Sequence, residues 1–212
     1  MNALRRVCVF CGSSPGSNPA YVAAARQLGE TLANEGIGLV YGGGNVGMMG
    51  ELANAAVAAG GKVTGVIPKA LMDREVALIE LDDLRVVDSM HARKALMADL
   101  ADGFVAMPGG LGTLEEIIEV LTWAQLGLHT KPCALLNTAG YFDTLLAFLD
   151  EIAGARFMAE VHRQLILTAE APARLLGLHP RKGVIREGAD ADLVVFDPDG
   201  ASDLSVHALH MG

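Results

Sequence analysis

A glycine-rich segment followed by a carboxylate is the strongest chemical signal in this chain. Residues 108–116 read PGGLGTLEE, in which Gly109, Gly110 and Gly112 precede Glu116. Because glycine has no Cβ, backbone amides in such a segment can converge on a phosphate. A carboxylate beside an anion is unfavourable, but it suits a group that develops positive charge. We therefore expect the amides to hold a phosphate while Glu116 faces a group that develops positive charge.

A purely structural interpretation competes for the same residues. Thr113 is placed to cap the helix that follows, and Glu116, three residues later, completes the capping box T-x-x-E. In a capping box each side chain satisfies an amide of the first turn, so no ligand is needed. This interpretation leaves unexplained the three glycines directly before the cap.

A second glycine cluster occupies residues 42–50, GGGNVGMMG, and contains the spacing G-x-G-x-x-G. A dinucleotide site also requires an acidic residue about 20 positions later. The next apolar run instead leads into Pro68 and Lys69, so binding of NAD or FAD is disfavoured. Two interpretations stay open: a turn that lets a helix pack closely on a sheet, or amides such as those of Gly43 and Gly44 facing a ligand.

Short apolar runs alternate with longer helical stretches along the chain. We expect strands at 6–11, 37–41, 62–67, 84–87, 104–107, 133–136 and 165–167, and helices at 20–34, 47–59, 90–100, 113–126 and 141–152. Strands that are apolar throughout and followed by helices predict an α/β fold, a mostly parallel sheet with helices on both faces. Ligands of such sheets bind outside the carboxyl ends of the strands, so the loops at 11–15, 42–50 and 108–116 are expected to line the site.

Composition narrows the class of partner. The formal net charge is −9, and no run of Lys or Arg offsets it, so we expect no nucleic-acid partner. No stretch of about 18 apolar residues predicts a membrane span, and the start lacks a signal-peptide pattern. Three cysteines fit a reducing cytoplasm. Cys8 and Cys11 form a single C-x-x-C, which indicates structural cysteines on opposite strand faces rather than a zinc site.

Taken together, the motifs resemble the LONELY GUY (LOG) family, also described as lysine decarboxylase-like. PGGLGTLEE matches the motif P-G-G-x-G-T-x-x-E, and FCGSS, YGGGNVGMMG, SMHARK, LTWAQLGLH and KPCALLN extend the resemblance over about residues 5–176. The resemblance implies a Rossmann-like, doubly wound fold and a homodimer. It also implies hydrolysis of the N-glycosidic bond of cytokinin riboside 5′-monophosphates, and of AMP, to free base and ribose 5-phosphate. No metal or organic cofactor is implied, and no convincing lysine site for pyridoxal phosphate supports decarboxylation.

The resemblance also implies roles for individual residues. Arg93 and Glu116 match the catalytic pair of the family. Positions that match its substrate-lining residues are Glu75, Lys94, Gly110, Leu111, Gly112, Thr113, Leu114, Glu115 and Thr122, and the loop argument adds Ser13, Gly43, Gly44 and Gly109. Arg93 offers a planar fork of donors for holding phosphate, positioning Glu116 or assisting the leaving base. The alternative for Arg93 and Lys94 is an ordinary solvated helix face.

The pattern changes after Leu176. We therefore expect a phosphoribohydrolase domain over residues 1–177 and an atypical tail over 178–212. The tail resembles the C-terminal segment of hydantoinase-type amidohydrolases without their barrel or metal ligands, so it predicts no amidohydrolase activity. It is either a gene-fusion or frameshift remnant or a β-hairpin extension. The competing function for the whole chain is a non-catalytic nucleotide or molybdenum-cofactor carrier on the same fold.

Overall fold

The computed structural model describes residues 4–72, 81 and 83–176. Glu75 and the tail at 178–212 lie outside the described residues. The expected hairpin in the tail therefore stays a prediction.

A single seven-stranded sheet forms the centre of the fold, in the order β4-β3-β2-β1-β5-β6-β7. Its strands are β1 (Arg6–Phe10), β2 (Gly38–Tyr41), β3 (Val63–Pro68), β4 (Asp83–Val87), β5 (Gly103–Ala106), β6 (Cys133–Leu136) and β7 (Ile166–Ala169). Every neighbouring pair is parallel, with Val7 of β1 opposite Leu39 on one side and Gly103 on the other. The sheet expected to be mostly parallel is thus entirely parallel within the described residues.

The strand order explains where a ligand binds. The chain winds outward from β1 to β4, then returns to place β5 beside β1 and winds outward in the other direction. Adjacent loops at β1 and β5 therefore leave the sheet toward opposite faces, which opens a crevice at the carboxyl edge. This is the Rossmann-like, doubly wound arrangement that the sequence predicted.

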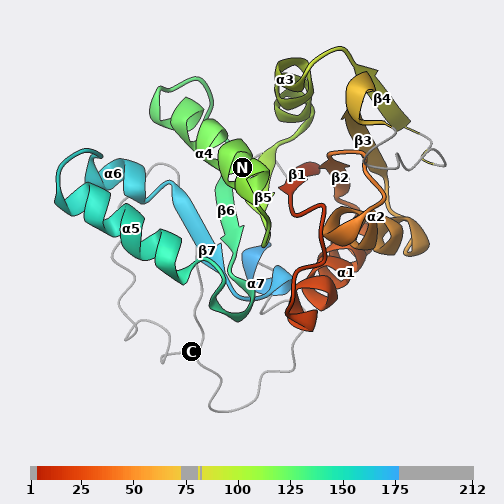
Figure 1. Cartoon of the computed structure of the whole chain (residues 1–212), viewed down its shortest axis with the longest axis horizontal. Coiled ribbons are helices and arrows are strands. Elements are labelled where there is room, and N and C mark those ends of the chain that lie inside the picture. The colour runs from red at the N-terminus through yellow and green to blue at the C-terminus, as the bar shows by residue number, and fades with distance from the viewer. Residues whose placement is uncertain (1–3, 73–80, 82, 177–212) are drawn as a thin grey trace, which may run out of the picture.

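Helices cover both faces of the sheet (Figure 1). They are α1 (Pro19–Asn34), α2 (Gly47–Ala58), α3 (Met90–Leu100), α4 (Leu111–Gln125), α5 (Asp143–Gly154), α6 (Glu160–Arg163) and α7 (Pro172–Leu175), with short 3₁₀ turns η1 (Lys69–Leu71) and η2 (Thr138–Gly140). Leu28 of α1 and Leu52 of α2 belong to one buried cluster, whereas Met97 of α3 and Ile117 of α4 belong to the other.

The central strands are buried on both sides because each face has its own helix layer. Cys8 packs in the cluster beneath α3 and α4, and Cys11 packs in the cluster beneath α1 and α2. The prediction that these two cysteines lie on opposite faces is therefore confirmed. Both thiols are free and buried.

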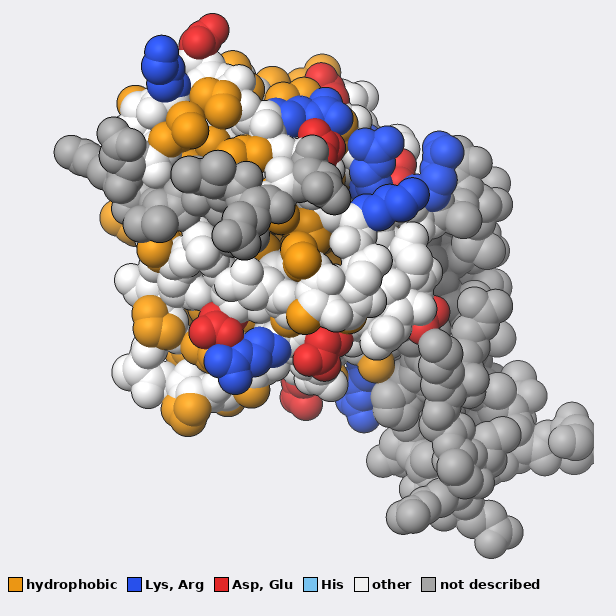
Figure 2. Space-filling view, turned by 90° about the vertical axis from the view of Figure 1, so that its right-hand side faces the viewer, with side chains coloured by type: hydrophobic (Ala, Val, Ile, Leu, Met, Phe, Trp, Pro, Cys, Tyr) orange, Lys and Arg blue, Asp and Glu red, His pale blue; other side chains and the backbone are white. Residues whose placement is uncertain are grey.

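The surface carries charges of both signs. Figure 2 shows the face on the right of Figure 1, where acidic and basic side chains are scattered among uncharged ones. On α1 and α2, for example, Arg26 donates to Glu51 at 2.6 Å.

Candidate functional site

Three loops meet at the carboxyl edge of the sheet, as expected, and main-chain hydrogen bonds join them. The Gly12 amide donates to the carbonyl of Pro108 at 3.1 Å. The amides of Met48 and Met49 donate to the carbonyl of Gly12 at 3.1 and 3.3 Å. The loop after β1 therefore lies between the two glycine-rich loops and binds both.

Helix α4 begins differently from the prediction. Its N-cap is Gly110, whose backbone is extended and whose cap has no side-chain hydrogen bond. Thr113 is the third residue of the helix and is only 4% exposed, so the expected Thr113–Glu116 capping box is wrong. The Thr113 hydroxyl instead packs against Gly109, where an added Cβ would lie 2.2 Å from its Oγ1. The helix begins early because this packing draws Thr113 under the loop.

The first turn of α4 presents unused donors. The first four amides of a helix have no partner within it, and they carry the positive end of the helix dipole. Among the described residues, no hydrogen bond accepts from the amides of Gly110, Leu111, Gly112 or Thr113. A Cβ added to Gly110 or Gly112 would meet nothing within 4 Å. The start of α4 is thus an open, donor-rich surface suited to an anion.

The loop at 42–50 is built differently, because the protein fills the space beside its glycines. A Cβ on Gly42 would lie 2.0 Å from Nη2 of Arg93, and one on Gly47 would lie 2.3 Å from the carbonyl carbon of Ser13. Gly43 has a φ of +79° and lies against Ile67. Packing therefore accounts for Gly42, Gly43 and Gly47, and whether amides of this loop also face a ligand stays a prediction. Gly43 and Gly44 are buried, and Ser13 is exposed at the loop edge.

Arg93 ties α3 to the ends of two strands. Its side chain is 5% exposed, and it donates from Nε to the carbonyl of Val66 at 3.1 Å and from Nη2 to the carbonyl of Gly42 at 3.0 Å. Ser89 caps the same helix by accepting from the amide of Ala92. The solvated-face alternative is wrong for Arg93, since its guanidinium is committed to backbone beneath the loop at 42–50.

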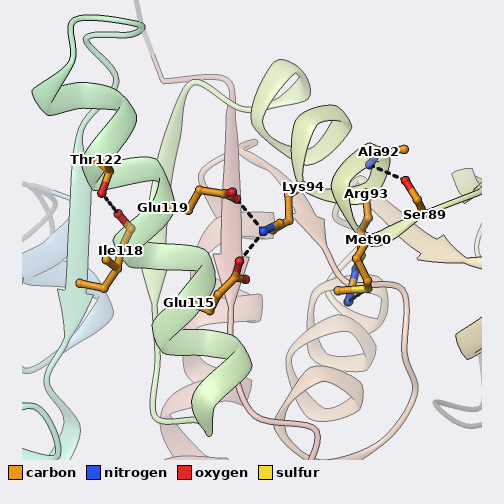
Figure 3. A network of polar contacts seen from close by, with 9 residues as sticks. All are labelled: Ser89, Met90, Ala92, Arg93, Lys94, Glu115, Ile118, Glu119 and Thr122. Atoms are coloured by element: carbon orange, nitrogen blue, oxygen red, sulfur yellow. Dashed lines mark hydrogen bonds and ion pairs between the residues drawn. The ribbon is translucent and has the colours of Figure 1, made fainter.

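Lys94 joins α3 to α4. Its ammonium contacts the carboxylate of Glu115 and lies 2.9 Å from Glu119, and its side chain is 8% exposed (Figure 3). Burial alone would lower the pKa of Lys94, but the hydrogen bonds with Glu115 and Glu119 outweigh burial and raise it. Lys94 is therefore a buried cation that holds the two helices in register, and the solvated-face alternative is wrong here as well.

Glu116 lies in the second turn of α4, half-buried. Burial raises the pKa of the Cys11 thiol, the negative charge of Glu116 raises it further, and Arg93 opposes this shift. The same three influences act on Cys8. The charges of Glu116 and Arg93 thus both act on the thiols of β1 and the loop after it. The catalytic pairing of Arg93 with Glu116 stays a prediction.

Thr122 lies apart from this group. Its hydroxyl donates to the carbonyl of Ile118 at 2.7 Å, and it is exposed further along α4, as Figure 3 shows. Ten residues of helix separate it from Gly112, which corresponds to about 15 Å along the axis.

Sequence reasoning missed Tyr141. Its hydroxyl donates to the carbonyl of Gly109 at 2.5 Å, and its ring lies edge-on to Tyr21. Together with Met48 and Gly110, these residues line a pocket of about 120 Å³. Tyr141 follows β6 in the turn before α5, and no sequence motif marked it.

Comparisons with known proteins agree with this geometry. A family model described as "Possible lysine decarboxylase" matches residues 49–179. The cytokinin riboside 5′-monophosphate phosphoribohydrolase LOG of Oryza sativa is 49% identical over 172 residues, 81% of this chain and 71% of that protein. LOG7 of Arabidopsis thaliana, with the same enzyme name, is 51% identical over 165 residues, 78% of this chain and 76% of its own length.

Solved structures share the fold at lower identity. The molybdenum cofactor binding protein of Rippkaea orientalis aligns with a TM-score of 0.60 at 25% identity, over 85% of this chain and 98% of that one. The molybdenum cofactor carrier protein of Chlamydomonas reinhardtii aligns with a TM-score of 0.63 at 23% identity, over 84% of this chain and 96% of that one.

Within the described residues, no helix is both long and apolar enough to cross a bilayer.

Proposed function

The chain belongs to the LONELY GUY (LOG) family of cytokinin riboside 5′-monophosphate phosphoribohydrolases, and we propose that it cleaves nucleoside 5′-monophosphates, AMP included, to free base and ribose 5-phosphate. The observation that carries the proposal is the surface of amide donors at the start of α4, one turn before Glu116, with no protein acceptor among the described residues. A 5′-phosphate on these amides would leave the ribose near that carboxylate.

The chemistry follows from the charges. As the bond between C1′ and the base nitrogen breaks, the base takes the bonding pair and the ribose gains oxocarbenium character. The carboxylate of Glu116 stabilises this cation and orients the water whose oxygen bonds to C1′. Glu116 takes one proton from that water, and the departing base takes up one proton at the nitrogen that held C1′, so the net reaction is hydrolysis. Arg93 keeps its place through Val66 and Gly42, which supports a positioning role toward Glu116.

The other proposed substrate contacts follow the same geometry. Gly109 to Glu115 form the phosphate loop and first turns, with Lys94 holding Glu115 in place. Ser13, which is exposed, and Gly43 and Gly44, which are buried, would contribute from the two neighbouring loops. The raised pKa of the ion-paired Lys94 does not suit Schiff-base formation, which a pyridoxal-dependent decarboxylase would need.

The proposed assembly is a homodimer that uses the outer surface of α4. Leu111 is 86% exposed, Ile118 38% and Leu126 66%, an apolar surface that a second copy would cover. Thr122 lies on this helix too far from Gly112 to line the same phosphate site, so it would serve the partner's site. Light scattering is expected to give about twice the mass of one 22.1 kDa chain.

We further propose a reducing compartment such as the cytoplasm, which the free thiols of Cys8, Cys11 and Cys133 support. We also propose that the catalytic unit ends near residue 177 and that the tail is dispensable. Deleting residues 181–212 is expected to leave hydrolysis largely intact. A folded but inactive truncation would contradict this organisation.

The function is tested by incubating the protein with AMP and with isopentenyladenosine 5′-monophosphate, and by separating the products by chromatography. Equal amounts of base and ribose 5-phosphate are expected. A parallel preparation of Glu116→Gln controls for contaminating hydrolases. Failure to release either base would favour the carrier function, for which the solved structures offer the shared fold alone.

A further inference from the structure

The turn between β6 and α5 is held in a strained shape. Ala139 has φ +53° and ψ +33°, and Gly140 follows with φ +70°. A left-handed conformation is costly for alanine, so neighbouring contacts must enforce it. Asn137 does so, because its Oδ1 accepts from the Phe142 amide at 2.7 Å and its Nδ2 donates to Asp143 at 2.7 Å.

This turn carries Tyr141 to the phosphate loop. The phenol donates to the carbonyl of Gly109 at 2.5 Å. The ring packs edge-on against Tyr21, with centroids 5.5 Å apart and planes at 78°, and against Phe142 at 5.0 Å and 86°. Two aromatic neighbours therefore fix the direction of the hydroxyl, although Tyr141 itself is 40% exposed.

The bonded carbonyl shares a peptide plane with the first open amide. In a trans peptide the C=O of one residue and the N–H of the next point in opposite directions. Holding the carbonyl of Gly109 toward Tyr141 thus points the amide of Gly110 away from it. Gly109 and Gly110 flank this peptide, so no Cβ of either residue restrains its rotation.

We propose that Tyr141 is a positioning residue that orients the Gly109–Gly110 peptide so that the Gly110 amide is ready to bind the substrate phosphate. The identity of the anion rests on the proposed function, but the orientation of the amide does not. Tyr141 acts through the peptide and touches no reacting atom.

The test compares Tyr141→Phe with the wild type. The Phe variant keeps both ring contacts and loses only the hydroxyl, so its affinity for ribose 5-phosphate, measured by calorimetry, is expected to fall roughly 3–10-fold. KM for AMP is expected to rise by the same factor with kcat nearly unchanged, because phosphate binding is lost equally from ground and transition states. Inhibition by adenine, which has no phosphate, is expected to stay the same.

Two further variants separate the hydrogen bond from structural damage. Thr31→Val removes a comparable hydroxyl, which donates to the carbonyl of Gln27 at 2.6 Å on the remote surface of α1, and is expected to leave every value unchanged. Tyr141→His has a shorter ring whose N–H does not reach the Gly109 carbonyl, so its affinity is expected to be no higher than that of the Phe variant.

Three results would overturn the proposal: unchanged ribose 5-phosphate affinity in Tyr141→Phe, equal weakening toward adenine, or a His variant that binds ribose 5-phosphate as tightly as the wild type. Circular dichroism establishes that each variant is folded at the assay temperature. If the wild type hydrolyses no nucleotide, calorimetry with ribose 5-phosphate and with inorganic phosphate still decides the role of Tyr141.

Discussion

The two glycine-rich loops of this chain look alike in sequence and differ in what surrounds them. In the loop at 42–50, Gly42 and Gly47 have no side chain because Arg93 and the backbone of Ser13 occupy the space. At the start of α4, Gly110 and Gly112 face open space, and neither has a positive φ. A glycine whose missing side chain is replaced by protein serves packing. A glycine without that replacement leaves room outside the chain, and at Gly110 and Gly112 the proposed function would place a phosphate there.

The largest effect is expected from replacing Glu116, the carboxylate that follows the glycines at the start of α4. Glu116→Gln keeps the shape of the side chain and removes its charge, so hydrolysis of AMP is expected to fall about 100-fold or more. Chromatography of released adenine measures it, with the surface variant Glu51→Gln as a control that keeps full activity. Normal turnover by Glu116→Gln would show that Glu116 takes no part in the chemical step.

Substitutions of the packed glycines in the loop at 42–50 are expected to lower the free energy of unfolding. Gly47→Ala places a Cβ 2.3 Å from the Ser13 carbonyl carbon at a φ of +55°, so the free energy of unfolding is expected to fall by about 3 kcal/mol in urea titrations. Gly60→Ala isolates the backbone cost, because Gly60 has φ +78° and no neighbour within 4 Å. It is expected to lose about 1 kcal/mol. Equal losses of unfolding free energy in Gly47→Ala and Gly60→Ala would show that crowding adds no cost at Gly47.

Substitutions of the open glycines at the start of α4 are expected to weaken substrate binding instead. Gly110→Ala adds a methyl group where the phosphate would lie, so KM for AMP is expected to rise roughly 10-fold, since small displacements of a bound group cost affinity. Its free energy of unfolding is expected to stay within about 1 kcal/mol of the wild type. Gly154→Ala, at another open glycine, is the matched control for steady-state kinetics. An unaltered KM in Gly110→Ala would place the phosphate elsewhere.

The smallest effect is a gain in stability. Gly112 is inside α4 with open space around it, so Gly112→Ala is expected to raise the free energy of unfolding by about 0.5–1 kcal/mol without ligand. Thermal denaturation with saturating ribose 5-phosphate is expected to cancel or reverse this gain, because the variant binds the ligand less well. Destabilisation of the unliganded variant would mean that Gly112 also serves packing.

The sheet and most helices were predictable because their signals are local. Apolar runs such as residues 6–10 and 133–136 form strands within a residue or two of the expected bounds, and α3 has the expected limits. Parallel pairing followed from strands that are apolar on both faces. The start of α4 was missed because T-x-x-E indicated Thr113 as the cap, whereas Gly110 is the N-cap and Thr113 is buried against Gly109 inside the first turn.

In the site, too, residues within motifs were predictable from sequence, whereas the contacts that depend on the fold were not. Glu116 and Arg93 were found from motifs, but the burial of Arg93 and its bonds to Val66 and Gly42 come from the fold. The same holds for Lys94 between its two carboxylates. Tyr141 had no signal at all, since its partner lies 32 positions away and the contact is to a backbone carbonyl.

The junction of the three loops is made of main-chain atoms alone, through Gly12, Pro108 and the amides of Met48 and Met49. Main-chain hydrogen bonds of this kind do not depend on which side chains surround them. Ser13 and Ser14, exposed at that junction, can therefore be exchanged without breaking its main-chain hydrogen bonds. Under the proposed function, such a design would let these side chains vary while the binding of the sugar-phosphate is retained.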